Sequence, residues 1–212
     1  WYSFPVGESN TVFVGPLIEN YYMHGTTPSI YKPVLKAFTL GGNGAAYGAS
    51  TDTGAGWSFK ADNGFAVSSN IGTKSKSTQK DSDDNYIESG LLTNESKTSW
   101  ATQVGLTKEQ YAVSAMVNLK YNGWSDSYFT AGSAQTGNTT NYGLRAWWRP
   151  SETGTATPEV SLGYDYTTIA DVADSVDSTD AYFVGLSWLD TFNADDRIGI
   201  AFGQPQTRED NT

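Results

Sequence analysis

Apolar and polar residues alternate with a period of two along many short segments, and this pattern constrains the fold more than any other feature of the chain. In 111–121, the odd positions hold Tyr, Val, Ala and Leu, whereas the even positions hold Ala, Ser, Met, Asn and Lys. Successive side chains of a β-strand point to opposite faces, so this alternation predicts strands with one apolar face. The same period recurs at 55–61, 65–72, 99–106, 141–149, 159–166, 182–188 and 197–203.

The composition argues against several kinds of protein. The chain has 212 residues, enough for one domain, with no Cys and a single His, His24. A thiolate metal site is therefore impossible and a Ser-His-Asp triad would depend on one residue, so we expect no enzyme, no metal site and no cofactor. The net charge of −10 argues against a nucleic-acid partner, which would require a basic surface. No apolar run approaches the ~18 residues of a transmembrane helix.

The connections between the predicted strands alternate in length. Short turns are expected near 61–65, 108–110, 150–157 and 190–196, and long connections near 19–53, 73–98, 122–140 and 167–180. Asn63-Gly64 marks one tight hairpin, because these residues tolerate the positive φ that such turns need. An antiparallel meander explains the alternation, with short turns on one rim and long loops on the other. The sequence thus predicts an all-β, antiparallel up-and-down fold of about ten strands in a single domain over 1–212.

Alternation alone fits both a soluble β-sandwich and a transmembrane β-barrel. The face opposite the apolar one is rich in Gly, Ala and Ser with scattered charges, which suits a watery lumen. Aromatic residues of the apolar face lie near strand ends, as expected where Trp and Tyr sit at the headgroup level. The pattern therefore favours a barrel whose aromatic girdles comprise Trp100, Tyr111, Tyr121, Tyr142, Trp148, Tyr164, Tyr166, Tyr182 and Trp188.

Three segments resemble the barrel of cyanobacterial outer-membrane porins, a group called iron-uptake porins and related to the carbohydrate-selective porins. They read SFPVGESNTVFVGP, GLRAWWRPSETGTATPEVSLGYDY and AYFVGLSWLDTFNADDRIGIAFGQP, and the resemblance extends from about Ser3 to Pro205 with gaps in the loops. It implies an outer-membrane barrel of about sixteen strands, a homotrimer, and an N-terminal domain that binds the cell wall. On this interpretation the chain is a central portion of the barrel, without the signal peptide, the wall-binding domain or the C-terminal strands.

A porin performs no chemistry, and its selectivity depends on the width and the charge of the pore. We therefore expect a passive channel in the outer membrane, surrounded by the lipid bilayer, for small hydrophilic solutes: inorganic ions including iron, or sugars. The alternative is a secreted, soluble β-sandwich that binds glycans in the manner of a lectin.

Alternation also predicts which side chains face the lumen. Arg145 and Arg149, with Glu159 across the turn, are expected to form part of a charged ladder, and Trp147 to offer a stacking surface for a sugar. Each of these side chains could instead be merely solvated or stabilise the wall. The predicted pore-lining residues are Lys60, Lys120, Arg145, Trp147, Arg149, Glu159, Asp165 and Arg197.

The segment 19–53 is long, follows an early strand, and is the candidate constriction loop; an ordinary outer loop is the equally open alternative. Its candidate residues are Tyr21, Tyr22, His24, Tyr31, Lys32 and Lys36.

Overall fold

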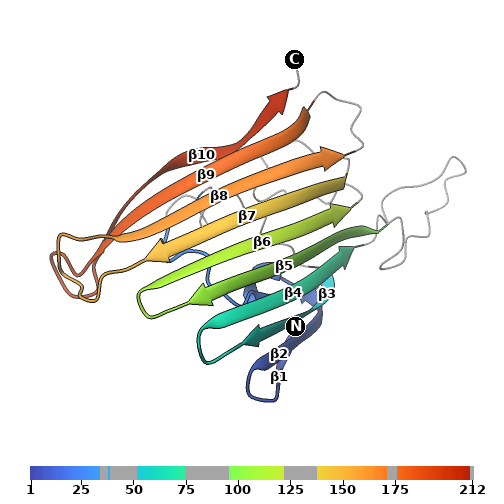
Figure 1. The fold of residues 1–212 in the computed structure, drawn as a ribbon, viewed down its shortest axis with the longest axis horizontal. Coiled ribbons are helices and arrows are strands. Elements are labelled where there is room, and N and C mark those ends of the chain that lie inside the picture. Colours follow the sequence, from blue (N-terminus) through green and yellow to red (C-terminus); the bar gives the residue numbers. More distant parts are fainter. Residues whose placement is uncertain (34–37, 39–51, 75–95, 122–137, 171–175, 211–212) are drawn as a thin grey trace, which may run out of the picture.

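The computed structural model of the chain contains one antiparallel ten-stranded sheet and almost no helix (Figure 1). The structure describes residues 1–33, 38, 52–74, 96–121, 138–170 and 176–210. Strand order in the sheet is the order along the chain, so each strand pairs with its sequence neighbours. The strands are β1 (Tyr2–Val6), β2 (Asn10–Ile18), β3 (Asp52–Lys60), β4 (Phe65–Lys74), β5 (Lys97–Thr107), β6 (Tyr111–Tyr121), β7 (Asn138–Trp148), β8 (Glu159–Ala170), β9 (Val176–Leu189) and β10 (Arg197–Asp210), and a 3₁₀ helix, η1, spans Asn20–Met23.

The predicted all-β meander is confirmed, but one predicted loop is largely wrong. The sequence suggested a long loop over 167–180, whereas β8 continues to Ala170 and β9 begins at Val176. Thr167 pairs with Thr179 and Thr168 with Ser178. Threonine is a good strand residue even where the apolar alternation has faded, and cross-strand pairing extends the ladder there. The helix η1 was not predicted.

The hairpin between β3 and β4 depends on Gly64. This residue has a φ of +87°, and its N–H donates to the carbonyl of Ala61 at 2.9 Å. A Cβ at this position would lie 1.9 Å from the carbonyl oxygen of Thr107, the last residue of β5. Glycine is therefore required for both the left-handed backbone and the close approach, and the predicted Asn63-Gly64 turn is confirmed.

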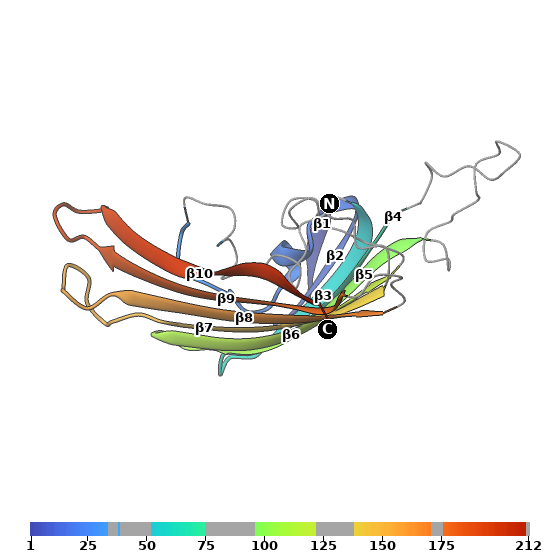
Figure 2. The same ribbon diagram turned by 90° about the horizontal axis from the view of Figure 1, so that it is seen from above.

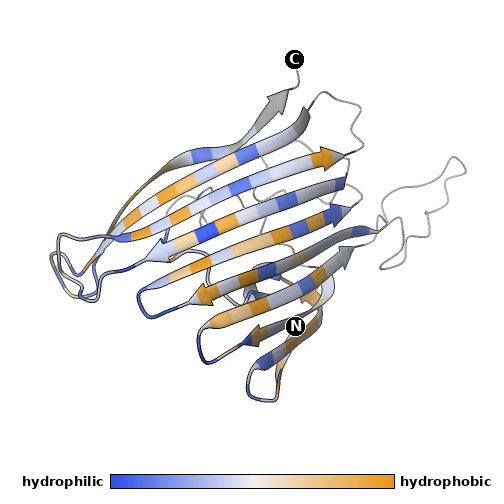
Figure 3. Ribbon diagram, in the orientation of Figure 1, coloured by the Kyte–Doolittle hydropathy of each residue, from blue (hydrophilic) through white to orange (hydrophobic). Residues whose placement is uncertain are grey.

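The sheet is curved, and its two faces have opposite chemistry. Figure 2 shows the curvature, and Figure 3 shows apolar and polar residues alternating along the strands. On the convex face, large apolar side chains are exposed, including Trp100 (50%), Leu144 (56%) and Phe202 (58%). On the concave face, polar side chains such as Gln103, Asn118 and Ser161 are buried. This distribution is the inverse of a water-soluble sheet, in which the apolar face is the covered one.

The strands are staggered in one direction. A continuous row of directly paired residues crosses the convex face through Phe202, Val184, Leu162, Ala146, Val113, Leu106 and Phe65. Along this row the residues come steadily closer to the rim that carries the short turns: Val184 lies inside β9, whereas Phe65 is the first residue of β4. Such a stagger tilts the strands relative to the rim, as the wall of a closed barrel requires.

The ten strands do not close on themselves, so β1 and β10 are the edges of the sheet. Pro5 lies in β1 and Pro205 in β10, next to a register shift. Proline lacks an N–H for the ladder and is tolerated at such edge and irregular positions. Within the described part of the chain, no helix has the length and apolar character needed to span a membrane.

Candidate functional site on the concave face

Residues 19–33, here called the inner strap, cross the concave face after β2. In Figure 2, η1 and the residues after it lie on the inner side of the curved sheet. At the start of the strap, the side-chain amide of Asn20 donates to Asn70 Oδ1 on β4 at 2.6 Å. The N–H of Gly25 donates to Ser68 Oγ, also on β4, at 3.1 Å.

Side chains of the sheet form hydrogen bonds with the backbone of the strap. The N–H of Thr26 donates to Gln103 Oε1 at 2.9 Å, and Gln103 Nε2 donates to the carbonyl of Thr26 at 3.0 Å. The side-chain amide of Gln103 on β5 thus supplies the strap with one acceptor and one donor, as the backbone of a neighbouring strand would. Further along, the N–H groups of Ile30 and Tyr31 both donate to Ser161 Oγ on β8 at 3.2 Å. Buried backbone groups require partners, and the polar concave face supplies them.

Glycines of the concave face make room for the strap. A Cβ on Gly105 would lie 2.3 Å from Thr26 Oγ1, and a Cβ on Gly185 would lie 2.7 Å from the ring of Tyr31. Gly199 lies beneath the same ring, and a Cβ on this residue would lie 3.1 Å from Tyr31 Cε2. Glycine in a strand often marks the close approach of another backbone, and these positions fit that rule. The sequence interpretation attributed the Gly-rich composition of this face to a watery lumen, whereas in the structure these three glycines make room for the inner strap.

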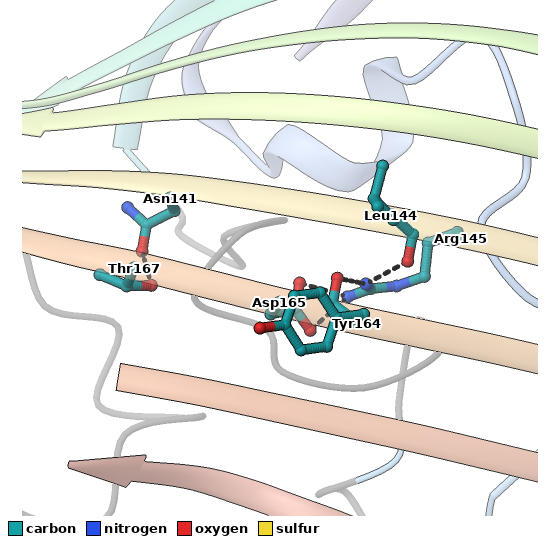
Figure 4. Close-up of polar contacts among 6 residues, drawn as sticks. All are labelled: Asn141, Leu144, Arg145, Tyr164, Asp165 and Thr167. Carbon is teal, nitrogen blue, oxygen red and sulfur yellow. Dashed lines mark hydrogen bonds and ion pairs between the residues drawn. The ribbon is translucent and has the colours of Figure 1, made fainter. Parts of the chain in front are cut away.

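Arg145 and Asp165 form a buried ion pair between β7 and β8 (Figure 4). Arg145 Nη2 donates to both carboxylate oxygens of Asp165 at 2.9 Å, and the two side chains are 1% and 2% exposed. Arg145 Nη1 also donates to the carbonyls of Leu144 and Tyr164, at 2.9 and 3.1 Å. The carboxylate of Asp165 balances the charge of Arg145, and both Nη atoms of Arg145 donate hydrogen bonds. Arg145 therefore joins β7 to β8.

The predicted ladder of Arg145, Arg149 and Glu159 is not formed. Arg145 pairs with Asp165, whereas Glu159 Oε2 accepts from Arg197 Nη1 at 3.3 Å. Arg149 follows the end of β7, is exposed, and donates from Nε to the carbonyl of Glu109 at 2.9 Å. Cross-strand register explains the difference. Glu159 is the first residue of β8 and pairs with Ser187 of β9. Its carboxylate therefore meets Arg197 of β10, beyond β9, and not an arginine of β7.

The strap covers Trp147. Its side chain is 5% exposed, and Nε1 donates to the carbonyl of Thr27 at 3.0 Å. The expectation that this ring offers an open stacking surface for a sugar is therefore wrong for this arrangement. The guanidinium of Arg149 lies 5.3 Å from the centre of the same ring.

The remaining predicted pore-lining residues lie on the concave face. Lys60 is the last residue of β3, pairs with Ala66 and is exposed. Lys120 on β6 is 3% exposed, and Arg197, the first residue of β10, is exposed and also donates to the carbonyl of Ile30 at 3.3 Å. Arg197 therefore contacts both the wall and the end of the strap.

Most predicted girdle residues are exposed on the convex face. Exposures range from 37% for Tyr166 to 50% for Trp100, and the group also includes Tyr111, Tyr121, Tyr142, Trp148, Tyr164 and Tyr182. Trp188 is half-buried, and its Nε1 donates to the carbonyl of Ala156 in the turn after β7 at 2.9 Å.

The predicted constriction residues are placed differently from one another. Tyr31 packs against the wall, with its ring centre 5.5 Å from that of Phe183, whereas Tyr22 (55%) and Lys32 are exposed. His24 is half-buried, and Lys36 lies outside the described residues. The Tyr21 hydroxyl donates to Glu19; burial raises the pKa of this phenol and the hydrogen bond raises it further, so the group stays protonated.

A row of amide and hydroxyl side chains was missed by the sequence interpretation, which concentrated on charges. Ser99 Oγ donates to Asn118 Oδ1 at 2.9 Å, and Thr167 Oγ1 donates to Asn141 Oδ1 at 2.8 Å. Asn141 in turn donates to the carbonyl of Asn118 at 3.1 Å. The signal was the occurrence of Asn, Ser and Thr at the non-apolar positions of adjacent strands. In the described residues, no three His, Asp or Glu side chains are grouped so as to hold a metal ion.

Comparisons of the chain with protein-family models, with curated proteins and with solved structures found no match. The resemblance to cyanobacterial porins stays a prediction, and inferences about function depend on the geometry of the sheet and the strap.

Proposed function

We propose that the chain forms part of the wall of an outer-membrane porin, a β-barrel that passes small hydrophilic solutes passively. One observation carries the proposal: the exposed convex face is apolar while the covered concave face is polar and charged. Burying apolar surface is the main driving force of folding in water, so a sheet with this inverted pattern needs an apolar solvent around it. A lipid bilayer is such a solvent, and its interfaces favour the exposed Trp and Tyr residues.

The stagger of the strands and the chemistry of the interior support the same proposal. A staggered antiparallel meander is the architecture from which membrane barrels are built. A furrow of about 650 Å³ crosses the convex face between residues such as Val104, Leu144 and Leu162, and its lining is almost wholly apolar. In lipid, the edges β1 and β10 must find partners, because an unpaired backbone group there costs several kcal/mol. The proposal therefore requires further strands to complete the barrel.

The proposed channel is narrowed by the inner strap, which lies on the concave face where a pore would run. Its contacts reach from Asn70 on β4 to Arg197 on β10, so it crosses most of the arc. The strap would reduce the cross-section without closing the pore, and solutes would pass beside its exposed residues, such as Tyr22 and Lys32.

The test is electrical. The full-length protein, purified in detergent and added to a planar lipid bilayer, is expected to give discrete conductance steps. A variant lacking residues 19–33 is expected to give larger steps, because the strap occupies the lumen. Folded protein that yields no steps would contradict the channel proposal, and unchanged steps in the deletion variant would contradict the narrowing role of the strap.

A further inference from the structure

Four aromatic rings lie side by side on the concave side of the sheet, at the start of the inner strap. The ring centre of Trp1 lies 6.1 Å from that of Phe13 and 5.9 Å from that of Tyr22. The ring centre of Tyr22 lies in turn 4.3 Å from that of Tyr21. These four rings, here called the aromatic row, form a continuous apolar surface on a face that is otherwise rich in amide and hydroxyl side chains.

The register of β2 and the turn of η1 assemble the aromatic row. Trp1 directly precedes β1 and lies over Gly15 of β2, which shares the concave face with Phe13. A Cβ on Gly15 would lie 2.7 Å from Trp1 Cα, so glycine leaves room for this residue. The N–H of Tyr22 donates to the carbonyl of Glu19 at 3.2 Å, and this turn brings the tyrosine ring against that of Trp1.

Two rings of the aromatic row are open toward the proposed lumen. Trp1 is 51% exposed and Tyr22 is 55% exposed, whereas Phe13 is buried. The other exposed aromatic side chains of the described strands lie on the convex face. An aromatic surface that stays open on the polar side of the sheet gains free energy when a solute covers it, so it is a candidate binding surface.

A carboxylate lies at one end of the aromatic row. Glu19 Oε2 accepts the hydrogen bond of the Tyr21 hydroxyl, which stays protonated. Within the described part of the chain, no hydrogen bond or ion pair engages Glu19 Oε1. The site therefore combines electron-rich ring faces with a carboxylate oxygen that can accept a further hydrogen bond.

From this arrangement we infer that the aromatic row and Glu19 bind small organic cations, such as alkylated amines. The faces of Trp and Tyr rings attract a cation placed over them, and the carboxylate adds the attraction of an opposite charge. A neutral sugar would also stack on the rings but would gain nothing from the charge of Glu19. As a statement about transport, the inference rests on the proposed function, because a solute meets these rings inside the lumen.

The experiment compares choline with its neutral carbon isostere, in which a tert-butyl group replaces the trimethylammonium group. Isothermal titration calorimetry of the full-length protein in detergent should show that choline binds more tightly than the isostere. Tyr22→Leu should weaken choline binding by a factor of about two to five, as expected for one exposed cation–π contact. Glu19→Gln removes the charge but retains an acceptor, and it should weaken binding by a similar factor of about two to five.

Tyr2→Leu is the matched control, because Tyr2 is 73% exposed and pairs with Val14 on the convex face. The same substitution there should leave the affinity for choline unchanged. Equal binding of choline and the isostere, or unchanged affinity in E19Q, would overturn the preference for cations. Equal effects of Y22L and Y2L would overturn the assignment to the aromatic row.

The same preparation in a planar bilayer separates this inference from the porin proposal. Protein that gives conductance steps but does not bind choline would overturn the inference alone. Folded protein that binds choline but gives no steps would contradict the porin proposal and leave the binding site intact.

Discussion

Leu144 and Arg145 are adjacent in sequence and have opposite surroundings. The side chain of Leu144 is 56% exposed on the convex face, whereas Arg145 is 3% exposed on the concave face. The pleat of the strand produces this difference, since a shift of one residue changes the face. The face of each residue could therefore be predicted from alternation. The partner of Arg145 could not, because a cross-strand partner depends on register, and Asp165 is twenty residues away in the sequence.

Replacing Arg145 by methionine should destabilise the protein strongly. The substitution leaves the carboxylate of Asp165 buried without its bidentate cation, and breaking a buried pair in this way costs about 3–5 kcal/mol. The free energy of unfolding in urea, measured on detergent-solubilised protein, would show the loss.

The double variant R145M/D165L is the control, because it removes both charges and replaces them with apolar side chains of similar size. It should recover most of the lost stability. A single variant as stable as the parent would contradict the structural role assigned to the pair.

At the scale of elements, the sequence predicted that the inner strap exists as a separate segment but not which residues it contacts. A long segment after an early strand could be singled out from its length and composition alone. Its partners could not be predicted: Thr27 contacts Trp147 across 120 positions, and Ile30 contacts Ser161 across 131. Such contacts arise only when the sheet has curved and brought distant strands under one segment. The glycines beneath Tyr31 likewise gave no signal that distinguished them from turn glycines.

Gln103→Ala should loosen the strap. The substitution removes both hydrogen bonds to the backbone of Thr26, whose N–H and carbonyl would remain buried without these partners. Each unsatisfied buried group costs about 1–3 kcal/mol, so the strap would detach locally before the sheet unfolds. Hydrogen exchange measured by mass spectrometry should then become faster in the peptide that contains 25–31.

Ser58→Ala is the matched control for this experiment. Ser58 is also buried on the concave face, on β3, and no hydrogen bond joins it to the described part of the strap. Its replacement should leave exchange in the strap unchanged. Equal acceleration in the two variants would show that any change of the concave face loosens the strap, and would exclude a specific role for Gln103.

For the whole molecule, the described strands form a single curved sheet, and the inner strap lies on its concave face. A sandwich would need a second sheet against the apolar face, and the described strands all belong to one sheet. The number of strands, their order, and the alternation of short turns on one rim with long connections on the other could be predicted from the sequence. Each of these features depends on local turns and on period-two patterning. What pairs with the two edges, β1 and β10, could not be predicted, because local patterns do not encode long-range pairing.

The environment of the convex face can be tested by placing one charge on it. Leu144 lies near the middle of β7, with its side chain exposed. An exposed residue in water tolerates arginine within about 0.5 kcal/mol, whereas arginine on the lipid face near the bilayer midplane costs about 2–4 kcal/mol. Phe192→Arg is the matched control, since Phe192 is 78% exposed in the turn between β9 and β10, outside the proposed bilayer. Unfolding free energies in lipid vesicles should fall for L144R and change little for F192R. If the two variants were equally stable, the convex face would be in contact with water, and the barrel interpretation would fail in favour of a water-soluble sheet.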